Sequence, residues 1–269
     1  MLTCPICQTP LILTDKTYRC THGHSFDVAK EGYVNLHVVQ HKKSKNPGDT
    51  IEAVQARRAF LAAGYYEPLK LAVADIVQAI KPQTVLDIGC GEGYYTQALM
   101  ATSKVIGLDI AKSAVQIAAK ADKANRITWV VGTGAVLPVA DASVSVCTSL
   151  FSPLPVDEMH RVLASDGILV VATPAPSHLY AMRAALFDTV IAHQPDKFVQ
   201  LLSPKFRLIQ THFITAPMQL DNQALKSLIA MTPYAYKAKP ERRAMLEQCA
   251  EFAVSGEFCV YVFAKSDAV

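Results

Sequence analysis

Three cysteines and two histidines lie near the N-terminus at a spacing that suits a metal ion. Cys4 and Cys7 are separated by two residues, so both thiolates can bind one ion from a single turn. Cys20 supplies a third ligand, and either His22 or His24 supplies the fourth. The three-residue gap between Cys20 and His24 favours His24, because it lets the chain wrap around the ion. With four protein ligands, the sequence predicts a structural Zn²⁺ site and not a catalytic one.

Two other interpretations of these cysteines are open, namely unliganded thiols and a redox pair. A redox pair with this spacing normally lies in a thioredoxin-like βαβ context, which residues 1–35 lack. These residues are turn-rich and poor in large apolar side chains, so they need a cross-link such as a bound metal ion to fold. The chain has seven cysteines, and an odd number argues against a disulfide framework.

A second candidate site is the run from Val85 to Gly93, where an apolar strand leads into Gly89, Gly91 and Gly93. Glycines let the chain turn sharply and bring its backbone close to a ligand. A dinucleotide-binding fingerprint would place its last glycine at position 94, where this chain has Tyr94. The alternative is a glycine turn that only joins a strand to a helix.

With Asp87 ahead of it, the glycine spacing resembles the first motif of class I S-adenosylmethionine-dependent methyltransferases. In that family the glycines pass beside the methionine moiety, and an acid ending the next strand, here Asp109, accepts from the ribose hydroxyls. Thr133 stands where an acid often meets the adenine. The resemblance implies S-adenosylmethionine as cofactor, bound by Asp87, Gly89, Gly91, Glu92, Gly93 and Asp109.

The elements around these motifs predict an α/β fold. Short apolar runs that alternate with helix-length segments indicate a mostly parallel sheet covered on both faces, with a late antiparallel pair at one edge. Two helices precede the sheet, over 50–64, capped by Thr50, and over 68–80. The predicted strands are 84–88, 105–109, 127–131, 144–149, 167–173, 206–215 and 257–264. The later helices are predicted at 94–101, 112–120, 156–163, 177–193 and within 221–250.

The sequence suggests three parts. Residues 1–36 form a zinc-binding ribbon, residues 37–80 a basic linker and helical connection, and residues 81–269 the S-adenosylmethionine-binding, Rossmann-like methyltransferase domain. Residues 1–70 hold nine Lys or Arg against six Asp or Glu, whereas residues 71–269 hold seventeen of each, so the net charge of +3 originates in the N-terminal quarter.

Motifs along nearly the whole chain are similar to the bacterial 23S ribosomal RNA guanine-N1 methyltransferases. They comprise the ribbon, residues 26–36, 48–49, 56–61, 64–66, the glycine-loop region 87–96, and residues 173–179 and 231–235. The resemblance implies methyl transfer to N1 of a guanine in the hairpin-35 loop of 23S rRNA, as in the nucleotide-745-type enzymes. It implies zinc ligands at Cys4, Cys7, Cys20 and His24, and cofactor contacts at Tyr66, Gly91, Glu92 and His178.

From the residues alone, Tyr66 is a core or interface side chain and His178 a helix-start residue; only the resemblance assigns them to a site. Five cations, Lys42, Lys43, Lys45, Arg57 and Arg58, are candidates to neutralise phosphates. Four aromatic residues, Tyr18, Phe26, Tyr33 and Tyr65, are candidates to stack on unpaired bases. A short basic run is also typical of a solvated loop.

The sequence does not identify a catalytic base, although guanine N1 carries a proton that must leave. Asp157, Glu158 and His160 follow the fourth strand and are candidates, with helix capping or surface charge as the alternative. The Asn-Pro-Pro-Tyr motif of amino-group methyltransferases is replaced by Phe151-Ser152-Pro153-Leu154, which fits a ring-nitrogen target.

Two other functions compete, a small-molecule methyltransferase and a non-catalytic zinc-ribbon RNA-binding protein. The ribbon and the localised charge disfavour the first, and the intact glycine loop disfavours the second. No apolar run approaches the ~20 residues of a membrane span and no signal peptide is visible, so a cytoplasmic protein without membrane association is expected. The family tends to form homodimers, on which the composition is silent.

Overall fold

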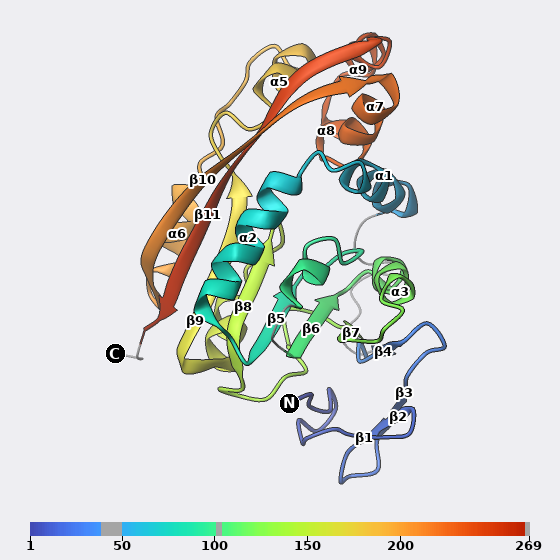
Figure 1. Ribbon diagram of the computed structural model, residues 1–269, viewed down its shortest axis with the longest axis vertical. Coiled ribbons are helices and arrows are strands. Elements are labelled where there is room, and N and C mark those ends of the chain that lie inside the picture. Colours follow the sequence, from blue (N-terminus) through green and yellow to red (C-terminus); the bar gives the residue numbers. More distant parts are fainter. Residues whose placement is uncertain (39–49, 101–103, 267–269) are drawn as a thin grey trace.

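The protein is built around a central eight-stranded sheet (Figure 1). The computed structural model describes residues 1–38, 50–100 and 104–266. The strand order of the sheet is β10 (Phe206–Asp221), β11 (Glu251–Lys265), β9 (Leu163–Pro174), β8 (Val144–Leu150), β5 (Thr84–Ile88), β6 (Lys104–Asp109), β7 (Ile127–Val131) and β4 (Tyr33–Asn35). The strands from β9 to β4 run parallel, and β11 and β10 are antiparallel at one edge. The strand order reverses beside β5, so the carboxyl ends there are the expected ligand position.

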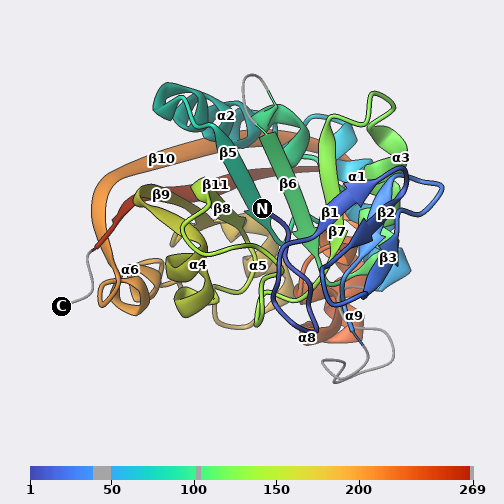
Figure 2. The ribbon, with the colours of Figure 1, turned by 90° about the horizontal axis from the view of Figure 1, so that it is seen from below.

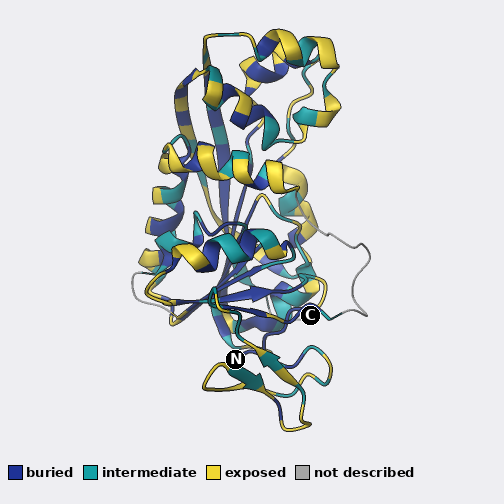
Figure 3. Cartoon of the chain, turned by 90° about the vertical axis from the view of Figure 1, so that its right-hand side faces the viewer, coloured by how far each residue is buried: buried dark blue, intermediate teal, exposed yellow. Residues whose placement is uncertain are grey.

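Helices cover both faces of the sheet because successive strand residues point to opposite sides. Val85 belongs to a core shared with α2 (Glu67–Ile80) and α3 (Lys112–Ala121). Leu86 belongs to a second core shared with α4 (Val156–Val162) and α6 (Asp196–Leu202). Buried residues accordingly follow the strands, and exposed ones the outer sides of the helices (Figure 3).

Two smaller units lie toward opposite ends of the long axis (Figure 1). At one end, β10 and β11 extend beyond the sheet and carry α7 (Asn222–Ala230), α8 (Tyr234–Lys237) and α9 (Pro240–Leu246). Helix α1 (Ile51–Ala62) packs on α7, and α5 (Tyr180–Leu186) packs on α9 and β11. At the other end, β1 (Ile12–Thr14), β2 (Thr17–Arg19) and β3 (Ser25–Asp27) form an antiparallel sheet of their own, seen from below in Figure 2.

The sequence correctly predicted the α/β class and most elements. The antiparallel edge pair is confirmed, and so is the cap of α1, where the Thr50 hydroxyl accepts from the Ala53 amide at 3.2 Å. No helix in the described part of the chain is long and apolar enough to cross a membrane. The basic loop of Lys42, Lys43 and Lys45 lies outside the described residues.

Several elements differ from the prediction. The segment after the glycine loop forms only a 3₁₀ turn, η2 (Thr96–Leu99), in which the Thr96 hydroxyl donates to the buried Asp87 carboxylate at 2.6 Å. The helix predicted over 177–193 is confined to α5, because Leu179 is left-handed (φ 52°) ahead of it and Phe187 is extended (φ −126°, ψ 147°) after it. Strand β4 was not predicted, since its three residues are too few to make an apolar pattern.

Candidate functional site

The four metal-ligand candidates converge in one cluster. The Sγ atoms of Cys4, Cys7 and Cys20 and the ring nitrogen of His24 all lie within 4.8 Å of one another. The Cys7–Cys20 Sγ distance is 3.7 Å, and His24 Nδ1 lies 3.5 Å from Cys4 Sγ and 3.4 Å from Cys20 Sγ. A tetrahedral zinc ion has ligand–ligand edges of about 3.5–3.8 Å, so the donor set and spacing fit zinc. His22 is exposed and lies outside the cluster.

The zinc cluster is joined to the main sheet by the first three residues. The Thr3 amide donates to the Pro138 carbonyl at 2.9 Å, and the Ala140 amide donates to the Met1 carbonyl at 2.8 Å. Leu2 and Cys4 belong to the core on the α4 side of the sheet. The N-terminal unit therefore rests on the segment 137–140.

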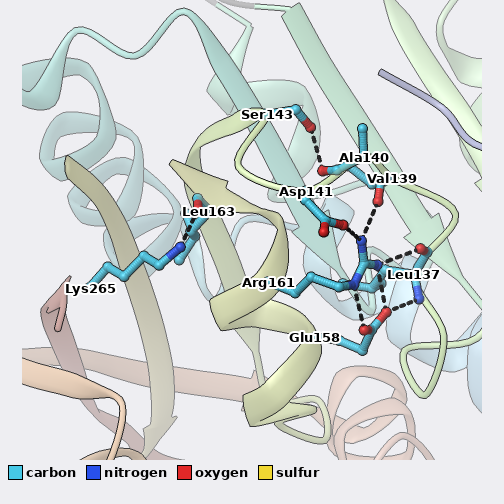
Figure 4. A network of polar contacts seen from close by, with 9 residues as sticks. All are labelled: Leu137, Val139, Ala140, Asp141, Ser143, Glu158, Arg161, Leu163 and Lys265. Atoms are coloured by element: carbon cyan, nitrogen blue, oxygen red, sulfur yellow. Dashed lines mark hydrogen bonds and ion pairs between the residues drawn. The ribbon is translucent and has the colours of Figure 1, made fainter. Parts of the chain in front are cut away.

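Arg161 holds that segment in place (Figure 4). Its guanidinium donates to the carbonyls of Leu137 and Val139 at 2.9 and 2.8 Å. It also pairs with Glu158 and Asp141, each at 2.6 Å. The Glu158 carboxylate in turn accepts from the Leu137 amide at 2.6 Å. This network fixes the surface on which the zinc unit docks.

Replacing Arg161 is expected to destabilise the protein. Arg161→Ala removes charge-assisted bonds to two carbonyls and leaves the Glu158 carboxylate without its cationic partner. This should lower the free energy of unfolding by roughly 2–4 kcal/mol. Chemical denaturation measures this loss. Arg207→Ala, an exposed arginine on β10, is the control and should cost less than about 0.5 kcal/mol. Equal stability of the two variants would contradict this role of Arg161.

The three glycines of the loop meet different surroundings, and all three have positive φ. A Cβ on Gly89 would lie 2.4 Å from the Ser152 Cβ, and one on Gly93 would lie 2.6 Å from the Trp129 ring. Both glycines are therefore needed for close packing within the protein. A Cβ on Gly91 would meet no described atom within 4 Å. Open space beside Gly91, at the carboxyl edge of the sheet, fits a ligand that approaches the backbone.

The two acids beside the loop have different environments. Asp87 is buried, and its carboxylate accepts from the hydroxyls of Thr96 and Thr148 at 2.6 and 2.7 Å. Asp87 thus supports the glycine loop from within β5, the strand that leads into it. Asp109 ends β6 and accepts from the Gly91 amide at 2.9 Å and the Ala111 amide at 2.7 Å. Its carboxylate is thus fixed next to the open side of the loop, while Glu92 is buried within the loop.

Burial raises the pKa of Asp87 to about 6, against the lowering effect of its two hydroxyl partners. Because this pKa lies above that of the unfolded chain, the folded state binds the proton more strongly, and stability falls as pH rises from about 4 to 6. Asp87→Asn removes this titration. Relative to the variant, the wild type should lose roughly 2–3 kcal/mol of unfolding free energy across this window. Denaturation curves at several pH values measure this, and parallel pH profiles would contradict it.

Tyr66 and His178, far apart in sequence, lie together in an aromatic wall. The Tyr66 ring contacts His178 at 6.2 Å and Phe258 at 4.8 Å between centroids. His178 Nδ1 lies 2.9 Å from the Glu257 carbonyl oxygen and 3.1 Å from the Glu257 amide nitrogen, and burial lowers the pKa of His178 to about 3, so the ring is neutral. Ring contacts continue from Phe258 to Phe151 and on to Tyr95, just past the glycine loop.

The three candidate bases are engaged elsewhere. Glu158 belongs to the Arg161 network, and Asp157 pairs with Lys205 at 2.6 Å. His160 Nε2 lies 3.0 Å from the Ser266 carbonyl oxygen. Sequence patterns did not identify three further residues of the site, Thr96, Thr148 and Ser152. The hydroxyls of Thr96 and Thr148 donate to Asp87, and Ser152 lies against Gly89. For Thr148 and Ser152 the available signal was a hydroxyl inside or just after an apolar strand, whereas Thr96 lies in the 3₁₀ turn η2.

Comparisons with known proteins add to this geometry. A zinc-ribbon model described as RlmA, N-terminal, matches residues 2–45, and a methyltransferase domain model matches residues 85–167. The 23S rRNA (guanine(748)-N(1))-methyltransferase of Streptomyces fradiae is 33% identical over 251 residues, covering 90% of this chain and 88% of that protein.

The chain belongs to the 23S rRNA guanine-N1-methyltransferase family. As a member of this family it is an S-adenosylmethionine-dependent methyltransferase with a structural zinc ribbon. Two solved structures share the fold of the methyltransferase. One is a chain from the complex of the Haloferax volcanii Trm112 methyltransferase activator with a methyltransferase (TM-score 0.52, 16% identity, 82% of this chain and 100% of that one). The other is the Bacillus YcgJ protein (TM-score 0.50, 19% identity, 74% and 98%).

Proposed function

We propose that this methyltransferase transfers a methyl group to N1 of a guanine in the hairpin-35 loop of 23S rRNA. The observation that carries the proposal is the similarity to a guanine-N1 enzyme over both the zinc ribbon and the methyltransferase domain. The similar enzyme acts on guanine 748 by its name, whereas the sequence motifs favoured the nucleotide-745 type. The proposal covers both guanines, and identification of the methylated nucleotide would distinguish them.

The cofactor would be held by three groups of residues. We propose that the backbone at Gly89, Gly91 and Gly93 passes beside its methionine part and that Asp109 accepts from its ribose hydroxyls. Glu92 and the wall of Tyr66 and His178 would complete the pocket, with Asp87 supporting the loop. S-adenosylmethionine supplies an activated methyl group on a sulfonium, so the protein's main task is alignment.

The proton of guanine N1 must leave before or during methyl transfer. Asp157, Glu158 and His160 are committed to other contacts, so we propose that none of them is the base. The neutral, buried His178 is bonded to the backbone at Nδ1 and would serve to shape the pocket.

A transfer assay tests the proposal. Unmodified hairpin-35 RNA is incubated with the enzyme and S-adenosylmethionine labelled in its methyl group, and the nucleosides are then identified. The expected product is 1-methylguanosine. Label in a small molecule but not in RNA would favour the small-molecule alternative. Absence of S-adenosylmethionine binding in calorimetry would favour the non-catalytic RNA-binding protein.

Cations of the N-terminal quarter are expected to contribute to RNA affinity. Lys42→Ala, Lys43→Ala and Lys45→Ala together should lower affinity for the hairpin roughly tenfold or more in moderate salt and flatten its salt dependence, because fewer counterions are released. The control changes Lys104 and Lys123 to Ala; both are exposed and lie near the amino ends of the parallel strands. Binding titrations at rising salt measure both. An unchanged affinity would exclude these lysines from the RNA interface.

A further inference from the structure

Phe151 occupies a conformation that a bulky residue rarely adopts. It follows β8 directly with φ of 58°, in the left-handed region, and its amide donates to the Ala172 carbonyl at 3.0 Å. Such backbone strain persists where the surrounding structure enforces it, and it is concentrated at functional sites. Phe151 is also 44% exposed, although aromatic neighbours surround it on one side.

The next residue fixes Phe151 relative to the glycine loop. The Ser152 hydroxyl donates to the Ile88 carbonyl at 2.7 Å and lies 2.7 Å from the Ser149 hydroxyl. A Cβ on Gly89 would collide with the Ser152 Cβ at 2.4 Å, so only glycine permits this approach. The Phe151 ring is thereby held at a set distance from the loop expected to bind the cofactor.

The Phe151 ring is only partly covered by its aromatic neighbours, and the residue is 44% exposed. Its centroid lies 5.6 Å from Phe258 at an interplanar angle of 63°, and 6.4 Å from Tyr95 at 51°. These are edge-on and tilted contacts, which anchor the ring without stacking on it. The Tyr95 hydroxyl is buried and has no hydrogen-bond partner in the part of the chain that the structure describes. A buried donor without a partner is rare in a native protein and is explained when a water or a ligand completes the site.

The position of Phe151 separates it from the cofactor's own base. The ribose-binding candidate Asp109 ends β6, on one side of β5, whereas Phe151 follows β8, on the other side. A ribose held by Asp109 and the Phe151 ring therefore lie on opposite sides of β5. The exposed part of the ring is left for a different planar group that reaches the same edge of the sheet.

We infer that Phe151 is the surface on which the extruded target guanine stacks, so that it positions the base for methyl transfer. This inference rests on the proposed function. Enzymes that act on a base take it out of its stack, and unpaired RNA bases are commonly received by aromatic side chains. The strained backbone, fixed by Ser152 against Gly89, directs the ring toward the incoming base.

The test compares Phe151→Leu with Phe151→Tyr. Leucine retains apolar volume but has no aromatic face, so kcat/KM for hairpin RNA should fall roughly 5- to 150-fold, the range for loss of one base–aromatic stack. Tyrosine should retain activity within about threefold. S-adenosylmethionine affinity and melting temperature should match the wild type in both variants, which shows that the fold and cofactor site are intact.

Phe213→Leu is the matched control. Phe213 is 74% exposed and pairs with Cys259, so it points to the opposite face of the sheet from Phe258; its loss should leave methylation unchanged. Wild-type activity in Phe151→Leu would overturn the inference while leaving the proposed function standing, and so would an equal loss in Phe151→Tyr and Phe151→Leu. Failure of the wild type itself to methylate the RNA would overturn the proposed function and the inference together.

Discussion

Removal of zinc is expected to unfold the N-terminal unit while leaving cofactor binding intact. Cys4 is completely buried and shares a core with Leu2, Leu11 and Val139, so loss of the ion also loosens apolar packing. Zinc binding contributes on the order of 10–16 kcal/mol in comparable peptides. The wild type should hold about one zinc ion per chain, and Cys7→Ser should lose it. Protection of the amides in the N-terminal unit against hydrogen exchange should then fall by more than about 100-fold. Elemental analysis and hydrogen exchange measure the two effects.

The matched control is Cys249→Ser, since Cys249 lies outside the cluster and its replacement should leave zinc content unchanged. RNA affinity should fall in Cys7→Ser, whereas affinity for S-adenosylmethionine should stay within about threefold, because the carboxyl edge of β5 and β6 is built from other residues. Normal exchange protection without zinc would contradict a structural role for the ion.

Asp109→Ala is expected to lower the affinity for S-adenosylmethionine by about 100-fold or more. The carboxylate is held by the Gly91 and Ala111 amides beside the open side of the loop, where it can accept from ribose hydroxyls. Hydrogen bonds to a charged group contribute roughly 1.5–3 kcal/mol each, so losing two predicts a decrease in affinity of about 100-fold or more. Isothermal calorimetry measures the dissociation constant.

Asp122→Ala separates this effect from a loss of stability. The Asp122 carboxylate also fixes backbone, accepting from the Ile127 amide at 2.8 Å and the Trp129 indole at 3.3 Å, but at the amino end of β7. The control should lower the melting temperature and leave cofactor affinity unchanged. If Asp109→Ala binds S-adenosylmethionine as the wild type does, the ribose assignment is wrong.

Apolar runs predicted the parallel strands well because each buried strand must be nearly continuously apolar. The same rule failed for β4, whose three residues are placed in the sheet by pairing with β7, about 95 residues farther along the chain. The ends of β10 and β11 were also missed, since they leave the sheet and half of their residues face solvent. Pairing in three dimensions, not local pattern, determines these segments.

The metal cluster was predictable from spacing because four ligands lie within a short, turn-rich segment. The aromatic wall was not, since Tyr66, His178 and Phe258 come from distant parts of the chain, and only the resemblance drew attention to the first two. Thr96 and Thr148 were missed for another reason. Their role depends on burial of Asp87, which local sequence does not reveal.

Mapping reverse-transcription stops on 23S rRNA tests the central claim most directly, because a methyl group on N1 of guanine blocks base pairing. RNA from cells lacking the gene is compared with RNA from cells complemented by the wild type or by Asp109→Ala. We predict one additional stop, in the hairpin-35 loop next to a guanine, in the wild-type complement alone. Identical stop patterns in all three RNAs would contradict the assignment of this chain as a guanine-N1 methyltransferase of 23S rRNA.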